Sequence, residues 1–544
     1  MVATGSLGLR HQRHRLVKFH YLKIGQLLLK VAAGNSEHPK RPNTQMKFLN
    51  RVSAILLIVS VAVGTYVRFQ GVELKSLWED ELFVLAMAQY FPLLPEPEQP
   101  MFRRIQVHEI TYGDTFWTAK AAEQNPPLYD LLVKASVKMM GANEWASRLP
   151  AVLAGCALLL AFAWRAWRET TPHLRKGLVW SVFLLAQYPI LIEYSREGRA
   201  YSLGVFAVGV GGLLWLSRWR DGWKGWQPPS WVELLLFTLA CYSHYQAALL
   251  VAILLLVDAV TATVRRSTTA WLRLLTFGLL FSVWLALNGH AIYYAANGGV
   301  AWSHPSLREI LENAALDSAT AVHGSWILLT TAILMVTLGS RWRQQGWVGI
   351  RGQVFELTVL GGLVLSFFLM AIIMSTRAGM AHPRYFTFII PFIAVMMGLV
   401  LAQLRNIVAI VLVASSFIAL AKTSTYLEFK SSHSDFRSMS IAATRDTDVN
   451  TIFVFPWKPN RVLYRISLEG VLHRDPEEQM IGLSTSDEVD AVCRVISGRP
   501  HVVAFGHDSG RLLIDAVYAR CGEQWPHRTH EQFLPTFSEH WRAR

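Results

Sequence analysis

The chain of 544 residues is 52% hydrophobic and carries a formal net charge of +14, a composition that excludes an ordinary soluble enzyme. Twenty tryptophans and only 17% charged residues are typical of a polytopic membrane protein with aromatic belts at the bilayer surfaces. The basic residues lie in short loops between hydrophobic segments, so the positive charge indicates membrane topology rather than nucleic-acid binding.

Residues 1–47 are polar and basic, and we expect them to form a cytoplasmic tail. Phe48 to Val67 has the length of one membrane span, and no small-residue cleavage site follows it, which predicts an uncleaved anchor. The next segment, 71–147, is therefore predicted to be a long first loop on the outer face. Met46 is also a suitable start, so the sequence leaves open whether residues 1–45 are translated.

The first outer loop contains an acidic triplet, Glu79, Asp80 and Glu81, directly after Trp78. Like charges repel, so three carboxylates at a membrane edge favour a functional role over the alternative, a solvated loop. Further along the loop, residues 127–141 are apolar with lysines at helical spacing. That stretch is too short to span and predicts a helix lying in the membrane interface.

The hydrophobic runs after this loop predict about eleven spans in total, with every basic connection on the cytoplasmic side. The segment 48–426 is thus predicted to be an all-α membrane domain. The later runs fall at 149–166, 178–194, 201–217, 231–245, 246–263, 271–292, 326–339, 355–374, 385–402 and 406–423.

Residues 427–544 differ in character, because polar and apolar residues mix there and short β-like runs appear. The runs at 451–455 and 501–505 predict strands, and 486–497 predicts a helix, so this part is expected to be a small α/β domain. An odd number of spans places it outside. Cys493 and Cys521 both fall in it and could pair in an oxidising compartment, although the sequence leaves that open.

On this topology, polar clusters collect on the outer face. A carboxylate near the bilayer can serve as general base for an acceptor hydroxyl or amine, and arginine beside tyrosine can bind a phosphate bidentately. The alternatives are ion pairs that only stabilise loops, basic and aromatic anchors at span ends and, for His244, a packed histidine at a helix end. Together the clusters predict a site for a donor whose leaving group is a lipid phosphate. They lie at 78–81, 193–201, 242–245 and 377–385.

The clusters resemble motifs of the C-type glycosyltransferases that use polyprenyl-phosphate sugars. The similarity is to bacterial relatives of the dolichyl-phosphate-mannose protein mannosyltransferases and of the lipid A aminoarabinose transferases, over about residues 48–440. No single motif is specific, but their order and spacing are. The matching stretches are Trp78-Glu79-Asp80-Glu81, Asn125-Pro126-Pro127-Leu128-Tyr129, Glu144 to Pro150, Arg196 to Leu203, Ser243-His244-Tyr245 and Arg384-Tyr385.

The resemblance implies that Asp80 is the general base, that Glu81 positions the acceptor and that Glu197 is a second catalytic carboxylate. Arg384 would hold the carrier phosphate. Ala200 departs from the family, which usually has proline before this tyrosine. The residues expected to contact substrate are Trp78, Tyr129, Glu193, Arg196, Arg199, Tyr201, His244, Arg384 and Tyr385.

The implied function is inverting transfer of a sugar from polyprenyl phosphate, such as undecaprenyl phosphate, to a lipid, glycan or protein acceptor at the outer face of the inner (plasma) membrane. The resemblance leaves a divalent metal open, because some members use one and others do not. The alternative from another class is a polytopic lipid or solute transporter or flippase. Such proteins carry ionisable residues and broken helices within their spans, whereas the charges here gather at one face.

Overall fold

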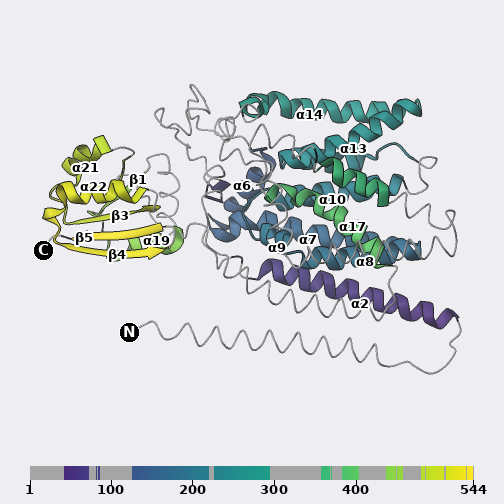
Figure 1. The fold of residues 1–544 in the computed structure, drawn as a ribbon, viewed down its shortest axis with the longest axis horizontal. Helices are drawn as coiled ribbons and strands as arrows, with labels where there is room; N and C mark the ends of the chain where they lie inside the picture. The colour runs from purple at the N-terminus through teal and green to yellow at the C-terminus, as the bar shows by residue number, and fades with distance from the viewer. Residues whose placement is uncertain are drawn as a thin grey trace.

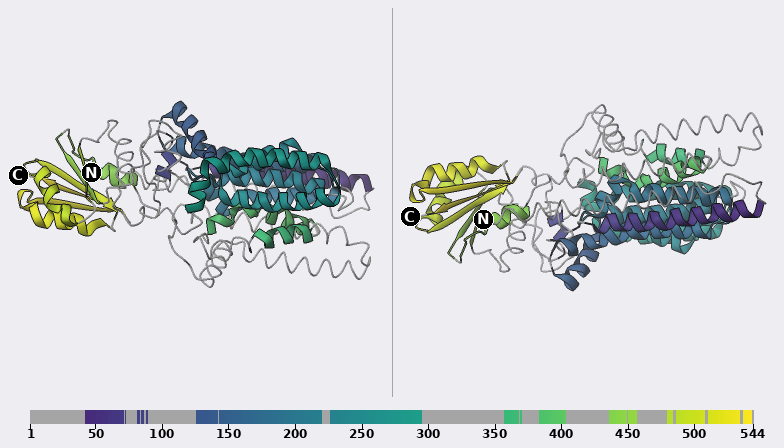
Figure 2. Two further views of the ribbon diagram at one scale, coloured as in Figure 1. Left: turned by 90° about the horizontal axis from the view of Figure 1, so that it is seen from above. Right: turned by 90° about the horizontal axis from the view of Figure 1, so that it is seen from below.

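The computed structural model describes a bundle of apolar helices and a separate α/β unit after it (Figure 1). We call the end of the bundle that carries α6 the site end, and the opposite end the far end. The α/β unit lies beyond the site end in each view (Figure 2). The described residues are 42–70, 72, 81–82, 84–85, 88, 125–141, 143–219, 226–294, 357–367, 369, 383–402, 436–448, 450–456, 479–483, 486–507, 510–533 and 536–542.

Within the described residues, four helices are long and apolar enough to cross a membrane, and a bent pair can make a fifth span. The prediction of a helical membrane protein is thus confirmed. The predicted total of about eleven spans includes the runs at 326–339 and 406–423, which lie outside the described residues. The four are α2 (Pro42–Phe69), α7 (Glu144–Arg168), α10 (Tyr201–Arg218) and α13 (Tyr245–Val264); the pair is α8 (Pro172–Gln187) and α9 (Pro189–Ser195).

Shorter elements complete this part of the bundle. The apolar helix α6 has only 13 residues, as expected for one that lies in the interface. α17 packs so tightly on α8 that a Cβ at Gly398 would collide with the carbonyl oxygen of Gly177. These elements are α6 (Leu128–Met140), α12 (Trp231–Cys241), α14 (Thr268–Tyr294), a helix at Leu357–Phe367, η2 (Pro383–Ile389) and α17 (Ile390–Leu401).

Helix ends follow from local sequence. α7 begins at Glu144 because the side chain of Asn143 accepts a hydrogen bond from the amide of Ala146 at 2.8 Å, a regular N-cap. α2 begins at Pro42, earlier than the predicted start at Phe48, and proline is well suited to a first helical turn.

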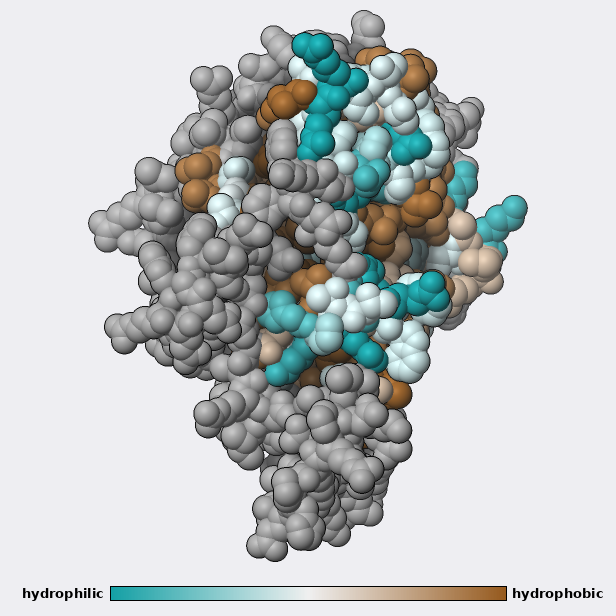
Figure 3. All heavy atoms as spheres, turned by 90° about the vertical axis from the view of Figure 1, so that its right-hand side faces the viewer, coloured by the Kyte–Doolittle hydropathy of each residue, from teal (hydrophilic) through white to brown (hydrophobic). Residues whose placement is uncertain are grey.

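Apolar side chains cover the outside of the bundle as well as its core. Leu160, Leu272 and Leu279 are 57%, 61% and 68% exposed, which is typical of surfaces that face lipid. At the far end, arginines stack on tryptophans: Arg168 lies 5.7 Å from the ring of Trp164 and Arg273 lies 5.5 Å from Trp231. Figure 3 faces this end, where hydrophilic side chains gather between apolar ones.

The C-terminal unit is a five-stranded mixed sheet in the order β2-β1-β3-β5-β4, with helices on both faces. β1 is parallel to β2 and β3, whereas β5 is antiparallel to β3 and β4. The predicted strands at 451–455 and 501–505 and the helix at 486–497 are confirmed. The elements are α19 (Phe436–Ala443), β1 (Ile452–Pro456), β2 (Met480–Leu483), α21 (Val489–Ile496), β3 (His501–His507), α22 (Arg511–Cys521), β4 (His527–Phe533) and β5 (Thr536–Arg542).

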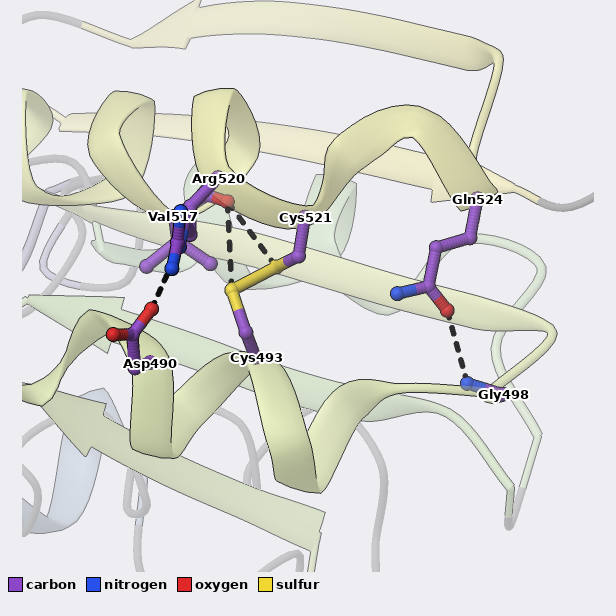
Figure 4. Close-up of a disulfide and its surroundings, with 7 residues drawn as sticks. All are labelled: Asp490, Cys493, Gly498, Val517, Arg520, Cys521 and Gln524. Atoms are coloured by element: carbon purple, nitrogen blue, oxygen red, sulfur yellow. Dashed lines mark hydrogen bonds and ion pairs between the residues drawn. A yellow bond between two sulfur atoms is a disulfide. The ribbon is translucent and has the colours of Figure 1, made fainter.

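Cys493 of α21 and Cys521 of α22 form a disulfide, which settles the pairing that the sequence left open (Figure 4). Their Cα atoms lie 5.8 Å apart. Asp490 and Arg520 join the same two helices through an ion pair of 2.7 Å. Both helices are therefore tied together above one face of the sheet.

Candidate functional site

A buried ion pair organises the site end. Arg148, in the first turns of α7, donates from Nε to Oε1 of Glu81 at 2.7 Å and from Nη2 to Oε2 at 2.6 Å. The two side chains are 1% and 0% exposed. Arg148 also donates from Nη1 to the carbonyl of Val72 at 2.5 Å. This bidentate, charge-assisted contact fixes the loop between α2 and α6 onto α7 at Glu81, the residue after Asp80 in the sequence.

Glu81 also reaches the segment after α9. The backbone amide of Gly198 donates to Oε1 of Glu81 at 2.5 Å. Glycine allows this close approach, because a Cβ at this position would collide with Oγ of Ser147 unless that side chain moved. One carboxylate thus joins three parts of the chain and holds Glu197, which is 7% exposed, beside the acidic loop.

The Asn125–Tyr129 stretch attaches at the same place. The hydroxyl of Tyr129 donates to the carbonyl of Ser147 at 2.9 Å, and the amide of Leu128 donates to the carbonyl of Tyr242 at 3.1 Å. Burial raises the pKa of Tyr129 well above its usual value, so this phenol stays a neutral donor. These contacts connect α6 to α7 and to the end of α12.

His244 is the N-cap residue of α13. Its Nδ1 accepts a hydrogen bond from the amide of Gln246 at 3.3 Å, so the neutral ring carries its proton on Nε2. Its ring centroid lies 4.9 Å from that of Tyr201 and 4.8 Å from that of Phe388 in η2. A potential donor nitrogen is therefore held between α10 and the element that contains Arg384.

Tyr201 is the centre of an aromatic wall made of Tyr194, Tyr201, His244 and Phe388. The rings of Tyr194 and Tyr201 lie 4.7 Å apart, and the guanidinium of Arg199 lies 5.9 Å from the Tyr201 ring. Tyr201 and Phe388 are buried, so these rings pack α9, α10, α13 and η2 together, with the half-buried Arg199 at their edge.

The structure brings together described parts of the first three clusters and places η2, which begins at the end of the fourth cluster, against the third. Glu81 contacts the segment of Arg196, Glu197 and Arg199, and Tyr201 packs on His244, which in turn packs on η2. Glu193 is half-buried on α9, just before that segment. Trp78 and Asp80, and the side chains of Arg384 and Tyr385, lie outside the described residues. The catalytic and binding roles assigned to all of these residues stay predictions.

Sequence reasoning assigned no role to three residues that hold the site together: Arg148, Gly198 and Ser147. Arg148 carried a signal, because an arginine five residues inside an apolar helix requires a partner. Within the described parts of the chain, no three His, Cys, Asp or Glu side chains come together as metal ligands. The sequence also allows a metal held by His108, Glu109 and Asp80, although no ligand spacing supports it, and these three residues lie outside those parts.

Part of the chain that contains this site matches a known protein family. Residues 124–286 match the model of the dolichyl-phosphate-mannose-protein mannosyltransferases, a region that contains α6, Arg148, Gly198 and His244. No curated protein matches the chain significantly.

Two solved structures share the fold. One is ArnT from Cupriavidus metallidurans in the apo state, with 13% identity, a TM-score of 0.53, and coverage of 90% of this chain and 98% of that one. The same protein bound to undecaprenyl phosphate gives 13% identity and a TM-score of 0.50, covering 89% and 97%. The resemblance to the C-type glycosyltransferases, first visible in short motifs, is thus confirmed by the family match and the fold.

Proposed function

We propose that this chain, a multi-pass membrane protein with the fold of the C-type glycosyltransferases, moves a sugar from a polyprenyl-phosphate carrier to an acceptor at the outer face of the inner membrane. One observation carries the proposal most directly. The Glu81 carboxylate, bonded to Arg148 and to the amide of Gly198, gathers the acidic loop and the 196–199 segment at one end of the bundle.

In the proposed reaction Asp80 is the general base. It takes the proton of the acceptor hydroxyl or amine while that atom attacks C1 of the sugar from the side opposite the phosphate. The C1–O bond to the carrier breaks through an oxocarbenium-like state, so the anomeric configuration inverts and polyprenyl phosphate leaves. Arg384 holds the phosphate and balances its negative charge.

In this scheme Glu81 acts by holding in place the segments around the acceptor. Its two oxygens already accept three hydrogen bonds, two from Arg148 and one from Gly198. A carboxylate engaged in this way by charge-assisted hydrogen bonds is a good anchor. Glu81 therefore positions the acceptor site by fixing the neighbouring Asp80, and Glu197 supplies the second carboxylate from the adjoining segment.

Two features support the outer location of the site end. Arginines stacked on tryptophans mark the far end, and basic residues prefer the cytoplasmic side. The C-terminal unit, beyond the site end, contains the Cys493–Cys521 disulfide, which persists in oxidising compartments. We accordingly divide the chain into a cytoplasmic tail (1–47), a catalytic membrane domain (48–426) and an outer C-terminal domain (427–544).

Undecaprenyl phosphate is the carrier of choice for a test, since one of the structures with this fold is bound to it. We would reconstitute the protein in liposomes with a panel of undecaprenyl-phosphate-linked sugars and lipid, glycan and peptide acceptors, and measure release of undecaprenyl phosphate. Asp80→Asn should reduce that release by about 100- to 10,000-fold, the usual cost of losing a general base.

The matched control is Arg168→Met, which alters the far end only and should leave turnover unchanged. Equal turnover in the wild type and in Asp80→Asn would remove Asp80 from the chemistry. Movement of labelled undecaprenyl phosphate between leaflets, with no sugar transferred from any donor, would favour the transporter instead.

A further inference from the structure

The bend between α8 and α9 opens the hydrogen-bond ladder of a membrane helix. Pro189 has no N–H, so it cannot donate to the carbonyl of Leu185, four residues before it. The two helices diverge by 60° at this point, inside the apolar bundle. Carbonyl groups left without donors in such surroundings are costly, so the bend requires donors from another element.

Arg68, in the last turn of α2, supplies those donors. Its side chain is fully buried, and it donates from Nη2 to the carbonyl of Leu185 at 3.0 Å and from Nη1 to that of Ala186 at 3.3 Å. Nη1 also donates to the carbonyl of Gly64 at 2.8 Å. The negative end of the α8 dipole favours a cation in this position. None of the ion pairs found among the described residues includes Arg68, so carbonyl groups are its partners there.

α7 closes over the same point. A Cβ at Gly155 would collide with Oγ of Ser195 and lie 3.0 Å from Nε of Arg68, so only glycine lets α7 approach so closely. Ser195, the last residue of α9, donates from Oγ to the carbonyl of Leu191 at 2.5 Å and accepts from Ser202 at 3.1 Å. The direction of α9 is thus fixed from α2, α7 and α10 together.

The segment 196–199 continues from the end of α9 in that direction, and the amide of its Gly198 donates to Glu81. We infer that Arg68 is a positioning residue: it caps the broken end of α8 and thereby aims this segment at Glu81, beside Asp80. The inference rests on the proposed function for its effect on turnover, but the cap itself can be tested without it. Its hydrogen-bond partners among the described residues are backbone carbonyls, so it acts through the bend.

The test compares Arg68→Met, which removes the donors and the charge, with Arg68→Lys, which keeps the charge on a single nitrogen. Hydrogen–deuterium exchange of residues 185–199 should rise in Arg68→Met and rise less in Arg68→Lys. Turnover should fall at least about tenfold in Arg68→Met while KM for the donor changes less than about threefold, since the carrier is held at η2. Binding of undecaprenyl phosphate should be nearly unchanged.

Arg273→Met is the matched control. Arg273 also donates to a backbone carbonyl, that of Pro229 at 2.7 Å, but at the far end, so its loss should leave exchange at 185–199 and turnover unchanged. Unchanged exchange in Arg68→Met would overturn the cap, and raised exchange with unchanged turnover would overturn the positioning role. If the Arg68→Met protein does not accumulate, Arg68→Lys decides the matter. Exchange at residues 185–199 equal to that of the wild type would then overturn the inference. A wild-type protein that transfers no sugar contradicts the proposed function and leaves the exchange result to decide the cap.

Discussion

The bundle holds a buried, ion-paired guanidinium at each end, and the two are built differently. At the site end, Arg148 grips one carboxylate, that of Glu81. At the far end, Arg218 grips two: Nε and Nη2 bond Glu233 at 2.8 and 2.6 Å, and Nη1 and Nη2 bond Asp258 at 3.1 and 2.6 Å. Both carboxylates at the far end are fully buried.

The two clusters also connect different parts of the chain. Arg218 joins α10 to the next two helices, over 15 and 40 residues of sequence, and Trp226 adds a bond to Asp258 at 3.1 Å. Glu81 joins the loop between α2 and α6 to residues 67 and 117 positions away. The far-end cluster therefore stabilises neighbouring helices through two carboxylates bonded to one guanidinium, whereas the Glu81 carboxylate connects a loop to α7 and to the 196–199 segment.

The largest difference should appear when Glu81 is changed to Gln. Arg148 then loses its charged partner while it stays buried, which costs about 3–5 kcal/mol of stability. The loop beside Asp80 loses its anchor, and a small misplacement of a catalytic group can cost about 100-fold in rate. We expect turnover to fall by about that factor in the release assay, with a lower thermal denaturation temperature in detergent.

The control for Glu81→Gln is Glu81→Asp, which keeps the charge on a shorter arm and should recover part of both losses. Full turnover in a destabilised Glu81→Gln protein would show that the pair serves folding alone, and the two ends would then be equivalent.

Next in size is the effect of Arg384 on the carrier. We expect Arg384→Lys to weaken binding of undecaprenyl phosphate and Arg384→Ala to weaken it more, since a charge-assisted contact of this kind is worth about 1.5–3 kcal/mol, roughly ten- to hundred-fold in affinity. Lysine cannot copy the bidentate geometry. Titration of the purified variants with labelled undecaprenyl phosphate measures this.

A helix anchor in the headgroup region would give another result, because lysine serves there as well as arginine. Unchanged affinity in Arg384→Lys favours that anchor, and unchanged affinity in Arg384→Ala ends the phosphate hypothesis. Either outcome would leave Glu81 and its neighbours as the part of the site end that distinguishes it from the far end.

Much of this arrangement could be predicted from sequence, for a physical reason. The alternation of basic loops assigns span ends to sides, so the clusters of Glu81, Arg199 and His244 could be placed at one end before any contact was known. The pairing of Arg148 with Glu81 could not, because it depends on how a loop folds back over 67 residues. The cap by Arg68 was missed likewise, since its partners are carbonyl groups, which any sequence supplies.

The C-terminal unit shows the same limit. β1 and β3 are buried apolar runs and were recognisable. β4 was not, because the strand His527–Phe533 is polar, and its residues 527–530 are exposed at the edge of the sheet, where no hydrophobic alternation is needed. Its place depends on pairing with β5, which no local pattern encodes.

A smaller effect is expected from acid on the C-terminal unit, where the buried pair is neutral rather than charged. Nε2 of His501 lies 3.0 Å from Nδ1 of His540, and Nε2 of His540 lies 2.8 Å from the carbonyl of Ala442 in α19. Burial, with His540 nearby, lowers the pKa of His501 to about 4, and burial also lowers that of His540.

Below the ordinary pKa of histidine, the unfolded chain therefore binds protons more readily than the folded unit does. Stability should be complete above about pH 6.5 and should fall as the pH drops toward 4, by about 2 kcal/mol at pH 4.5 for His501. Exchange at α19 would report it, and His501→Asn should flatten the profile. A flat pH profile of exchange at α19 in the wild type would contradict the prediction. A rise in exchange around Glu81 over the same pH range would contradict it as well.

The smallest effect is predicted for Asp258→Asn, although it neutralises a fully buried carboxylate just as Glu81→Gln does. Arg218 keeps Glu233 after this change, so the guanidinium retains one carboxylate partner. The lost Coulombic attraction is offset by relief of repulsion between two buried carboxylates and of the cost of burying one of them. We expect a change below about 1 kcal/mol in stability and no loss of turnover. The double variant Glu233→Gln with Asp258→Asn provides the internal check, because it leaves Arg218 without a carboxylate and should cost about 3–5 kcal/mol, as Glu81→Gln does. If Asp258→Asn alone costs as much as the double variant, then the count of carboxylates around each guanidinium is not what separates the two ends of the bundle.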